Sequence, residues 1–401
     1  MADDSDLGLD DRLRSLLSPM QTANQAELKN YIDSKINDLV RPGGLNYTNI
    51  TTENREFTAT ISTDGIGGSY RNIQDALNYV RTKGGGRILV LPGTYTISTS
   101  LTIYADTSIE GLSTSDCIID FNNTTNNFIF DTNATYIQIR SLTIKNSTSS
   151  LGSINTNSAD RCGIYNCLFS NNTIDIYING SGQIDINKNT TGALTASGTF
   201  VKTGVVSSLN WIENNLVNNC TSWSFEDCSQ TNLINNYIQS PGTHIFHGNF
   251  SFSTINNNFV VNGGSVAALD LVSCGDTLVT NNVFNTHLIL GTVSNSTFSS
   301  NKLRSDVTGI HGISLIKCTD NTITGNAIAT GTASTIDGIR LSGTTGGCVV
   351  SGNAIRISSG TPSYAVNIVD TSCAFNAVVG NFAFGNLINN GGTNGVVASN
   401  S

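Results

Sequence analysis

The residues of this sequence best suited to chemistry are a histidine, an aspartate and an arginine that occupy matching places in a repeat. The segments Ile-His-Gly-Ile-Ser-Leu and Ile-Asp-Gly-Ile-Arg-Leu align position by position and pair His311 with Asp337. The next copy adds Tyr364 to that column, and Arg340 and Asn367 lie three residues further along. A histidine beside an aspartate can form an oriented acid–base pair, and a guanidinium can hold an anionic sugar. We therefore predict His311 and Asp337 as catalytic residues, with Arg340, Tyr364 and Asn367 as ligand contacts.

Asp270 belongs to the second of these columns, two repeats before Ser314, and is predicted as a further ligand contact. The alternative is that this polar set has no ligand, because the outward positions of any soluble repeat protein must be polar. His244 and His247 share one repeat without a third ligand, which is more typical of surface or core histidines. The sequence has no phosphate-binding glycine loop, serine nucleophile motif or cluster of metal ligands, so no metal and no cofactor are predicted.

These columns are positioned by a short phrase that recurs eight times between Asn210 and Phe384. Apolar residues alternate with Ser, Thr or Asn and are followed by an asparagine, which predicts short half-buried strands. Intervals of 19 to 28 residues indicate stacked coils about 4.8 Å apart, in which the asparagines form a buried hydrogen-bonded column. The column residues are Asn215, Asn236, Asn258, Asn282, Asn301, Asn326, Asn353 and Asn381, and weaker copies place Asn146, Asn166 and Asn189 in the same slot.

Four of the nine cysteines lie eight residues before a column asparagine, on alternate turns: Cys228, Cys274, Cys318 and Cys373. Two turns are about 9.6 Å apart, too far for a disulfide. We therefore predict a buried column of free thiols rather than a metal or redox site. Such thiols are typical of a protein that folds in a reducing cytoplasm.

Composition excludes several classes of protein. The net charge is −9, and 20 Lys plus Arg stand against 51 Asn, which argues against a nucleic-acid partner because such proteins need a basic surface. No stretch has the apolar length of a membrane span, and the start of the sequence has no signal-peptide pattern. We expect neither a nucleic acid nor a membrane as a partner.

The first 45 residues are predicted to be helical. Ser18 and Pro19 open a helix that runs to about Val40, with one apolar stripe that includes Leu28 and Ile32. We interpret residues 1–45 as an attachment or oligomerisation segment, the alternative being a helix that packs on its own domain. Residues 46–63 are predicted as a linker, 64–385 as the coil and 386–401 as a C-terminal tail.

The start of the coil carries recognisable motifs. An amphipathic helix with Ile73 and Leu77 on one face suits a cap over the open end of a coil. The segments Tyr70-Arg-Asn-Ile-Gln-Asp-Ala-Leu, Gly84-Gly-Gly-Arg-Ile, Leu91-Pro-Gly-Thr-Tyr and Ser108-Ile-Glu-Gly resemble the pectate-lyase-like right-handed β-helix superfamily, especially its phage tailspike branch. The resemblance implies an all-β, right-handed parallel β-helix of about 12 rungs with an N-terminal capping helix.

The resemblance implies less about function, because this fold serves lyases, hydrolases, epimerases and binding proteins. Compared with polygalacturonases, this sequence keeps only a faint match around Ile310-His-Gly and Ile339-Arg-Leu, and the calcium cluster of pectate lyases is not apparent. We expect a virion tail component, made in the host cytoplasm, that either binds or binds and degrades a host surface polysaccharide. It would be a homotrimer joined to other tail or baseplate proteins through residues 1–45. The alternatives are a free polysaccharide lyase or hydrolase, and a structural spacer.

Overall fold

The computed structural model describes residues 57–65, 67–192, 198–204, 207–218, 222–240, 246–262, 267–305, 311–330, 337–357, 364–384, 388–398 and 400. The chain divides into two compact units, Met1–Phe57 and Thr58–Ser401. The predicted helices of residues 1–45, and most of the predicted linker, lie outside the described residues.

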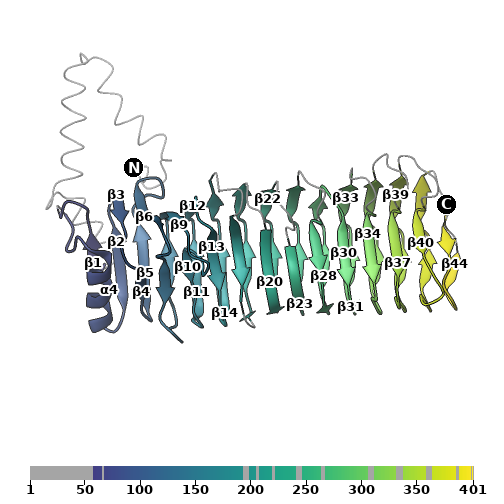
Figure 1. The fold of residues 1–401 in the computed structure, drawn as a ribbon, viewed down its shortest axis with the longest axis horizontal. Helices are drawn as coiled ribbons and strands as arrows, with labels where there is room; N and C mark the ends of the chain where they lie inside the picture. The colour runs from purple at the N-terminus through teal and green to yellow at the C-terminus, as the bar shows by residue number, and fades with distance from the viewer. Residues whose placement is uncertain are drawn as a thin grey trace, which may run out of the picture. The chain divides into compact units, whose positions relative to one another are not determined.

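The second unit is a right-handed parallel β-helix, as predicted from the repeat (Figure 1). Its described strands form one sheet of 31 strands and one of 13, the latter close to the predicted number of rungs. Every strand pairing between turns is parallel, and side chains alternate between the core and the outer surface (for example buried, partly exposed, buried in Leu269–Leu271). No helix of the described segments is long and apolar enough to cross a membrane.

The 31-stranded sheet contains two long rows of strands. The first row is β4 (Leu101–Ile103), β7 (Phe128–Phe130), β10 (Ile154–Asn155), β13 (Ile174–Ile178), β16 (Thr199–Thr203), β20 (Ser222–Ser229), β23 (Phe246–Ser251), β26 (Leu269–Leu271), β30 (Leu288–Gly291), β34 (Ile313–Ile316), β37 (Ile339–Ser342), β40 (Val366–Ile368) and β43 (Asn389–Asn390).

The second row is β1 (Ala59–Ile61), β2 (Gly86–Val90), β5 (Thr107–Gly111), β8 (Gln138–Arg140), β11 (Asp160–Tyr165), β14 (Gly182–Asn187), β18 (Trp211–Glu213), β21 (Asn232–Ile234), β24 (Thr254–Asn256), β28 (Leu278–Thr280), β32 (Thr297–Ser299), β35 (Thr322–Thr324), β38 (Val349–Ser351), β41 (Ala377–Val379) and β44 (Val396–Ala398). Three short strands complete the sheet: β17 (Ser207–Ser208), β27 (Cys274–Gly275) and β31 (Val293–Ser294).

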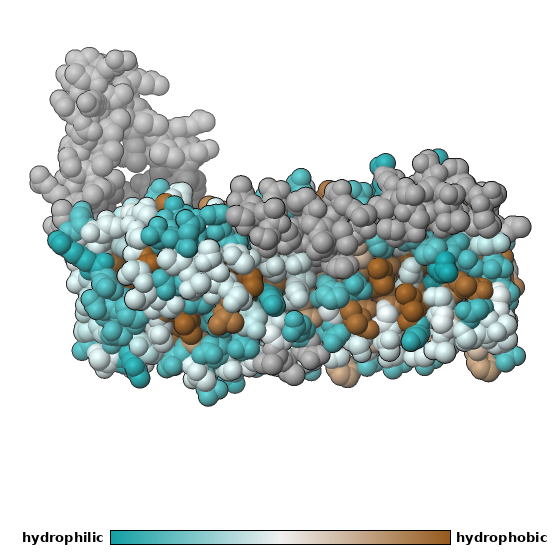
Figure 2. All heavy atoms as spheres, viewed as in Figure 1, coloured by the Kyte–Doolittle hydropathy of each residue, from teal (hydrophilic) through white to brown (hydrophobic). Residues whose placement is uncertain are grey.

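The thirteen-stranded sheet consists of β3 (Gly93–Thr96), β6 (Cys117–Thr124), β9 (Thr143–Ser147), β12 (Leu168–Ser170), β15 (Thr190–Thr191), β19 (Leu216–Asn218), β22 (Tyr237–Ser240), β25 (Phe259–Asn262), β29 (Val283–Phe284), β33 (Lys302–Ser305), β36 (Ala327–Thr330), β39 (Ala354–Ile357) and β42 (Phe382–Phe384). The outer surface of the coil is mostly polar or weakly polar, with scattered groups of apolar residues (Figure 2).

One helix, α4 (Ile73–Thr82), lies at the first turns of the coil, beside β1, β2 and β4 (Figure 1). The side chain of Asn72 caps it by accepting hydrogen bonds from the backbone N–H groups of Gln74 and Asp75. Its buried face consists of Ile73, Ala76, Leu77 and Val80. The predicted capping helix is therefore confirmed.

The buried asparagine column is also confirmed. The backbone N–H and the amide Nδ2 of Asn236 both donate to Oδ1 of Asn258, each at 3.0 Å, and Nδ2 of Asn258 donates to the carbonyl of Leu233 at 2.8 Å. The same pattern links successive turns from Asn189 to Asn400. Each amide therefore satisfies backbone groups that would otherwise be buried without partners.

Two of the weaker copies were assigned to the wrong slot. Asn166 lies one residue before the column, and Cys167 takes the column position, where its N–H donates to Asn189. Asn146 lies within β9, away from the column, and donates to Asp120. Asn166 has positive φ, like the residues that precede the column asparagines, so the sequence pattern confused two adjacent turn positions there.

The described cysteines are free and buried, as predicted. Cys228 lies opposite Phe250, and Cys274 lies opposite Val293, so large apolar residues separate the thiols. Burial raises the pKa of the Cys274 thiol to about 11. The column is part of the apolar core.

The coil extends beyond the boundaries expected at both ends. Strand β1 begins at Ala59, inside the predicted linker, and pairs with β2. At the other end β43 and β44 pair with earlier turns, and Asn400 continues the asparagine column, although residues 386–401 were expected to be a tail. The Asn- and Gly-rich composition hid a further turn.

Candidate functional site

The candidate site lies on the outer face of the first row of strands, where one column of side chains crosses successive turns. The register pairs Ser314 with Arg340, Arg340 with Asn367, and Asn367 with Asn389. The chain positions these residues because the flanking Ile, Leu and Val residues of each strand are buried in the core, which leaves the middle residue facing outward. The structure thus brings together the second column that the sequence predicted.

The residues of the other column, His311, Asp337 and Tyr364, lie just before the same strands. The N–H of Gly312 donates to the backbone carbonyl of Asp337 at 3.0 Å. The N–H of Gly338 donates to the backbone carbonyl of Tyr364 at 2.9 Å. Neither glycine has room for a side chain, because a Cβ at Gly312 would lie 2.6 Å from the Gly338 carbonyl oxygen. The His-Gly and Asp-Gly pairs therefore allow these turns to approach closely, which brings the two polar side chains into contact.

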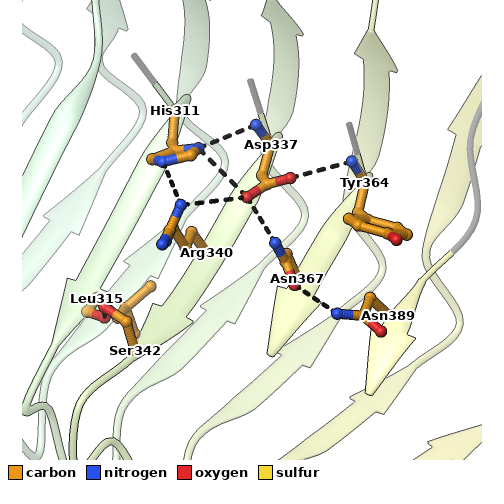
Figure 3. Close-up of polar contacts among 8 residues, drawn as sticks. All are labelled: His311, Leu315, Asp337, Arg340, Ser342, Tyr364, Asn367 and Asn389. Atoms are coloured by element: carbon orange, nitrogen blue, oxygen red, sulfur yellow. Dashed lines mark hydrogen bonds and ion pairs between the residues drawn. The ribbon is translucent and has the colours of Figure 1, made fainter. Parts of the chain in front are cut away.

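Asp337 is the centre of the hydrogen-bond network (Figure 3). Its Oδ1 accepts from the backbone N–H of Tyr364 at 3.0 Å, its Oδ2 accepts from Nδ2 of Asn367 at 2.8 Å, and Nδ1 of His311 is 3.3 Å from Oδ2. Only 4% of the side chain is exposed. The carboxylate is therefore fully engaged by protein groups. Its geometry differs from the predicted catalytic role, because a general acid or base must reach the substrate, and it suits a positioning residue.

His311 links Asp337 to Arg340. Nη1 of Arg340 is 2.9 Å from Nε2 of His311, and the backbone N–H of Asp337 is 2.9 Å from Nδ1. Burial lowers the pKa of His311 and Arg340 lowers it further, against the opposing effect of Asp337, so the imidazole is neutral at pH 7.

A neutral imidazole accepts at one nitrogen only. When Arg340 donates to Nε2, the proton resides on Nδ1 and points at Asp337. In the other tautomer the proton is on Nε2, and Nδ1 accepts from the N–H of Asp337 instead.

Arg340 is the group most available to a ligand, because 36% of its side chain is exposed. Its Nη1 is 3.9 Å from Oδ2 of Asp337, which orients a charge that still faces outward. Asn367 donates to Asp337 and accepts from Nδ2 of Asn389 at 2.9 Å, so its amide is fixed on both sides. Tyr364 contacts Asp337 through its backbone N–H rather than its phenol (Figure 3).

The structure does not bring Asp270 to this network. Asp270 lies in the same column as Arg340, but Ile289 and Ser314 separate them, a distance of three turns or about 14 Å. Its Oδ2 is instead 3.0 Å from Nδ1 of His247 in the preceding turn. The sequence reasoning missed this second His–Asp pair, although the distances of both residues from the asparagine column, 11 and 12 residues, gave the signal.

One protein-family model and several solved structures match this chain. The family described as "Periplasmic copper-binding protein (NosD)" matches residues 221–400, which is less than half of the chain. No curated protein sequence matches.

Several solved structures share the fold. The N-terminal fragment of bacteriophage Phi29 gene product 12 has a TM-score of 0.58 at 10% identity, covering 78% of this chain and 69% of that one. DFA-IIIase from Arthrobacter chlorophenolicus A6, solved with GF2, has 0.55 at 15%, covering 76% and 89%. The catalytic domain of a GH87 α-1,3-glucanase, solved with nigerose, has 0.53 at 13%, covering 86% and 68%.

The likeness is one of fold. The matches support the predicted right-handed β-helix, with carbohydrate-processing enzymes and a phage protein as structural neighbours. They do not confirm the pectate-lyase-like tailspike branch that the N-terminal motifs resemble.

The matched family's name implies copper, and the residues present do not fit a copper centre. Copper sites use histidine, cysteine and methionine ligands. The described part of the chain has no group of three or more His, Cys, Asp or Glu that could hold a metal ion. The cysteines described in the matched region are buried in the core, where burial raises the pKa of Cys348 to about 11 and disfavours the thiolate that binds metals.

Proposed function

We propose that this chain is a virion tail component that binds a host surface polysaccharide through the outer face of its β-helix. The observation that carries the proposal is the network of Arg340, His311, Asp337 and Asn367, in which buried groups hold an exposed guanidinium in one orientation. A guanidinium held in this way suits a carboxylate on an acidic sugar, because it offers paired donors in a fixed plane.

In this proposal, the structural neighbours described above support a carbohydrate ligand and a phage origin for this chain. One of the structural neighbours is a glucanase domain solved with nigerose, and another is a bacteriophage protein. In this proposal residues 1–45 join the chain to other virion proteins and to two further copies of itself. The chain is made in the host cytoplasm and resides in the virion.

The binding proposal is tested with the full chain and a panel of immobilised bacterial surface polysaccharides, some containing uronic acids and some neutral. We expect binding to an acidic polysaccharide, and we expect Arg340→Ala to weaken it at least tenfold, by loss of one charge-assisted contact. Arg356→Ala is the matched control, because Arg356 is an outward arginine on β39 in the other sheet. The proposal is wrong if no polysaccharide binds, or if both variants weaken binding equally.

The assembly is tested by light scattering. We expect the full chain to have the mass of three copies. A chain that lacks residues 1–45 should have the mass of fewer than three copies of the shortened chain. A monomer in both cases would rule out the assembly proposed here.

A further inference from the structure

A second set of chemically capable side chains lies on the outer face of the second row of strands, in earlier turns. The register pairs Arg140 with Tyr165 in the next turn. Asp185 lies opposite Trp211 on β18, and Glu213 follows two residues later on the same strand and the same face. Five side chains from four successive turns, β8, β11, β14 and β18, therefore share one patch.

Gly163 allows Tyr165 to reach across this patch. A Cβ at Gly163 would lie 2.1 Å from Cε2 of the Tyr165 ring, so the ring lies directly over this glycine. Gly163 is the residue opposite Asp185 in the next turn, so the Tyr165 ring that lies over this glycine is directed toward Asp185. The guanidinium of Arg140 lies 4.3 Å from the centre of the same ring. Arg140 and Tyr165 thus support one side of Asp185.

The other side of Asp185 has an unsatisfied acceptor. Its Oδ1 is buried and has no hydrogen-bond partner among the described residues. A buried acceptor without a partner is unfavourable by about 1–3 kcal/mol, so this carboxylate is held in a less stable state than the saturated Asp337. Trp211, which is 37% exposed, lies opposite Asp185 in the next turn. Its ring offers the flat apolar surface that sugar rings pack against.

The surroundings of the two carboxyl groups differ in a way that divides their roles. The pKa of Asp185 is raised, chiefly by burial, and the Tyr165 hydroxyl and the charge of Arg140 oppose part of this rise, whereas Glu213 has no such opposing group. Burial also raises the pKa of Glu213, and the nearby charge of Asp185 adds to the effect, which favours the protonated form of Glu213. Neighbouring carboxyls that differ in this way can act as a base and an acid.

The spacing of the strands sets the separation of the pair. Asp185 and Glu213 are diagonal neighbours, one turn apart and two residues apart along the strand. With about 4.8 Å between strands and about 6.6 Å for two residues, their Cα atoms are about 8 Å apart. Inverting glycosidases hold their two carboxyl groups, rather than their Cα atoms, about 6.5–9.5 Å apart. Two side chains that leave one face of the coil from Cα atoms at this spacing can reach that range.

We propose that Asp185 and Glu213 hydrolyse a glycosidic bond of the polysaccharide that this chain binds, with the sugar ring packed on Trp211. Glu213 donates its proton to the bridging oxygen, and the bond from that oxygen to the anomeric carbon breaks with its electron pair on the oxygen. Asp185 removes a proton from water as the water oxygen bonds to the anomeric carbon from the opposite face. One water is consumed, one new reducing end forms with inverted configuration, and the proton returns to Glu213 through solvent. The inference rests on the proposed function, because it requires a polysaccharide ligand.

The test uses the full chain and the same polysaccharide panel, and measures reducing ends, unsaturated ends and binding. We expect the wild-type chain to release reducing ends without unsaturated ends. Asp185→Asn and Glu213→Gln should each lower the rate at least a hundredfold, the effect expected of a general base or acid, while binding and the unfolding temperature stay unchanged. Asp116→Asn is the matched control, because Asp116 is an exposed carboxylate in an earlier turn, away from both sites.

The outcomes separate the two proposals. If the wild-type chain binds a polysaccharide and does not cut it, or if both variants cut it at the wild-type rate, the hydrolysis inference is wrong and the binding function stands. Unsaturated ends, or retained configuration in the product by NMR, would also overturn the inference. If no polysaccharide binds, both proposals fall.

Discussion

The buried asparagine column and the outer Arg340 network follow the same stacking rule and differ in what their side chains leave unsatisfied. In the column, Oδ1 of Asn258 accepts two hydrogen bonds and its Nδ2 donates to Leu233 and Asn282, so every polar group of the amide is used within the coil. In the outer network Asp337 is saturated in this way, but Arg340 keeps donors that face solvent. Regular stacking therefore supports both stability and recognition, and the unused donors mark the place for a ligand.

The largest expected effect comes from breaking the column. Asn258→Ala removes the acceptor of the Asn236 backbone N–H and of one of its two Nδ2 hydrogens, and the amide donor to the carbonyl of Leu233. At about 1–3 kcal/mol for each unsatisfied group, we expect unfolding to become easier by about 3 kcal/mol or more, measured by denaturant midpoint. The matched control is Asn257→Gly, because Asn257 is exposed and has a φ of 57° that glycine adopts readily. Equal effects for the two variants would contradict the role given to the column.

A smaller effect is expected from breaking the outer network at its centre. Asp337→Ala leaves the N–H of Tyr364 and the amide of Asn367 without their acceptor and frees Arg340. We expect a loss of about 2 kcal/mol in stability and a loss of polysaccharide binding similar to that of Arg340→Ala. Asp337→Asn retains one accepting oxygen and should be intermediate in both measurements. Wild-type binding by Asp337→Ala would show that this residue does not position Arg340.

The smallest effect concerns the charge of His311. Its pKa is lowered in the folded chain, so the folded state disfavours the proton, and its contribution to stability is present above about pH 6.5 and declines as the pH falls. We expect an NMR titration of the histidine Cε1–H signals, assigned with His311→Gln, to show a midpoint below 6.5. A midpoint above 6.5 would mean that Asp337 outweighs burial and Arg340. The column asparagines have no group that titrates in this range, so the column should not respond to this change of pH.

Much of the fold was predictable because the asparagine column gave every later turn a fixed reference position. His311, Asp337, Arg340 and Asn367 could be aligned from it without coordinates. The burial of Asp337 could not, because it depends on how closely Gly312 and Gly338 let adjacent turns approach.

The second patch was missed for a related reason. In the turn of Tyr165 the column position belongs to Cys167, so the sequence offered no asparagine from which to align Tyr165 with Asp185 in the next turn. Side-chain reach also matters, since Tyr165 meets Asp185 only by lying over a glycine. A reference based on one residue type fails where another residue type fills the same slot.

The burial of the thiols described earlier affects how readily the cysteines are oxidised during storage. The reactive form of cysteine is the thiolate, and burial raises the pKa of the Cys162 and Cys167 thiols to about 12, so little thiolate exists at neutral pH. Oxidation to sulfenic acid and beyond requires that form and access to an oxidant. The strands around the core therefore protect the thiols from oxidation in air. We expect the described cysteines to remain unmodified in mass spectra after long storage without a reducing agent.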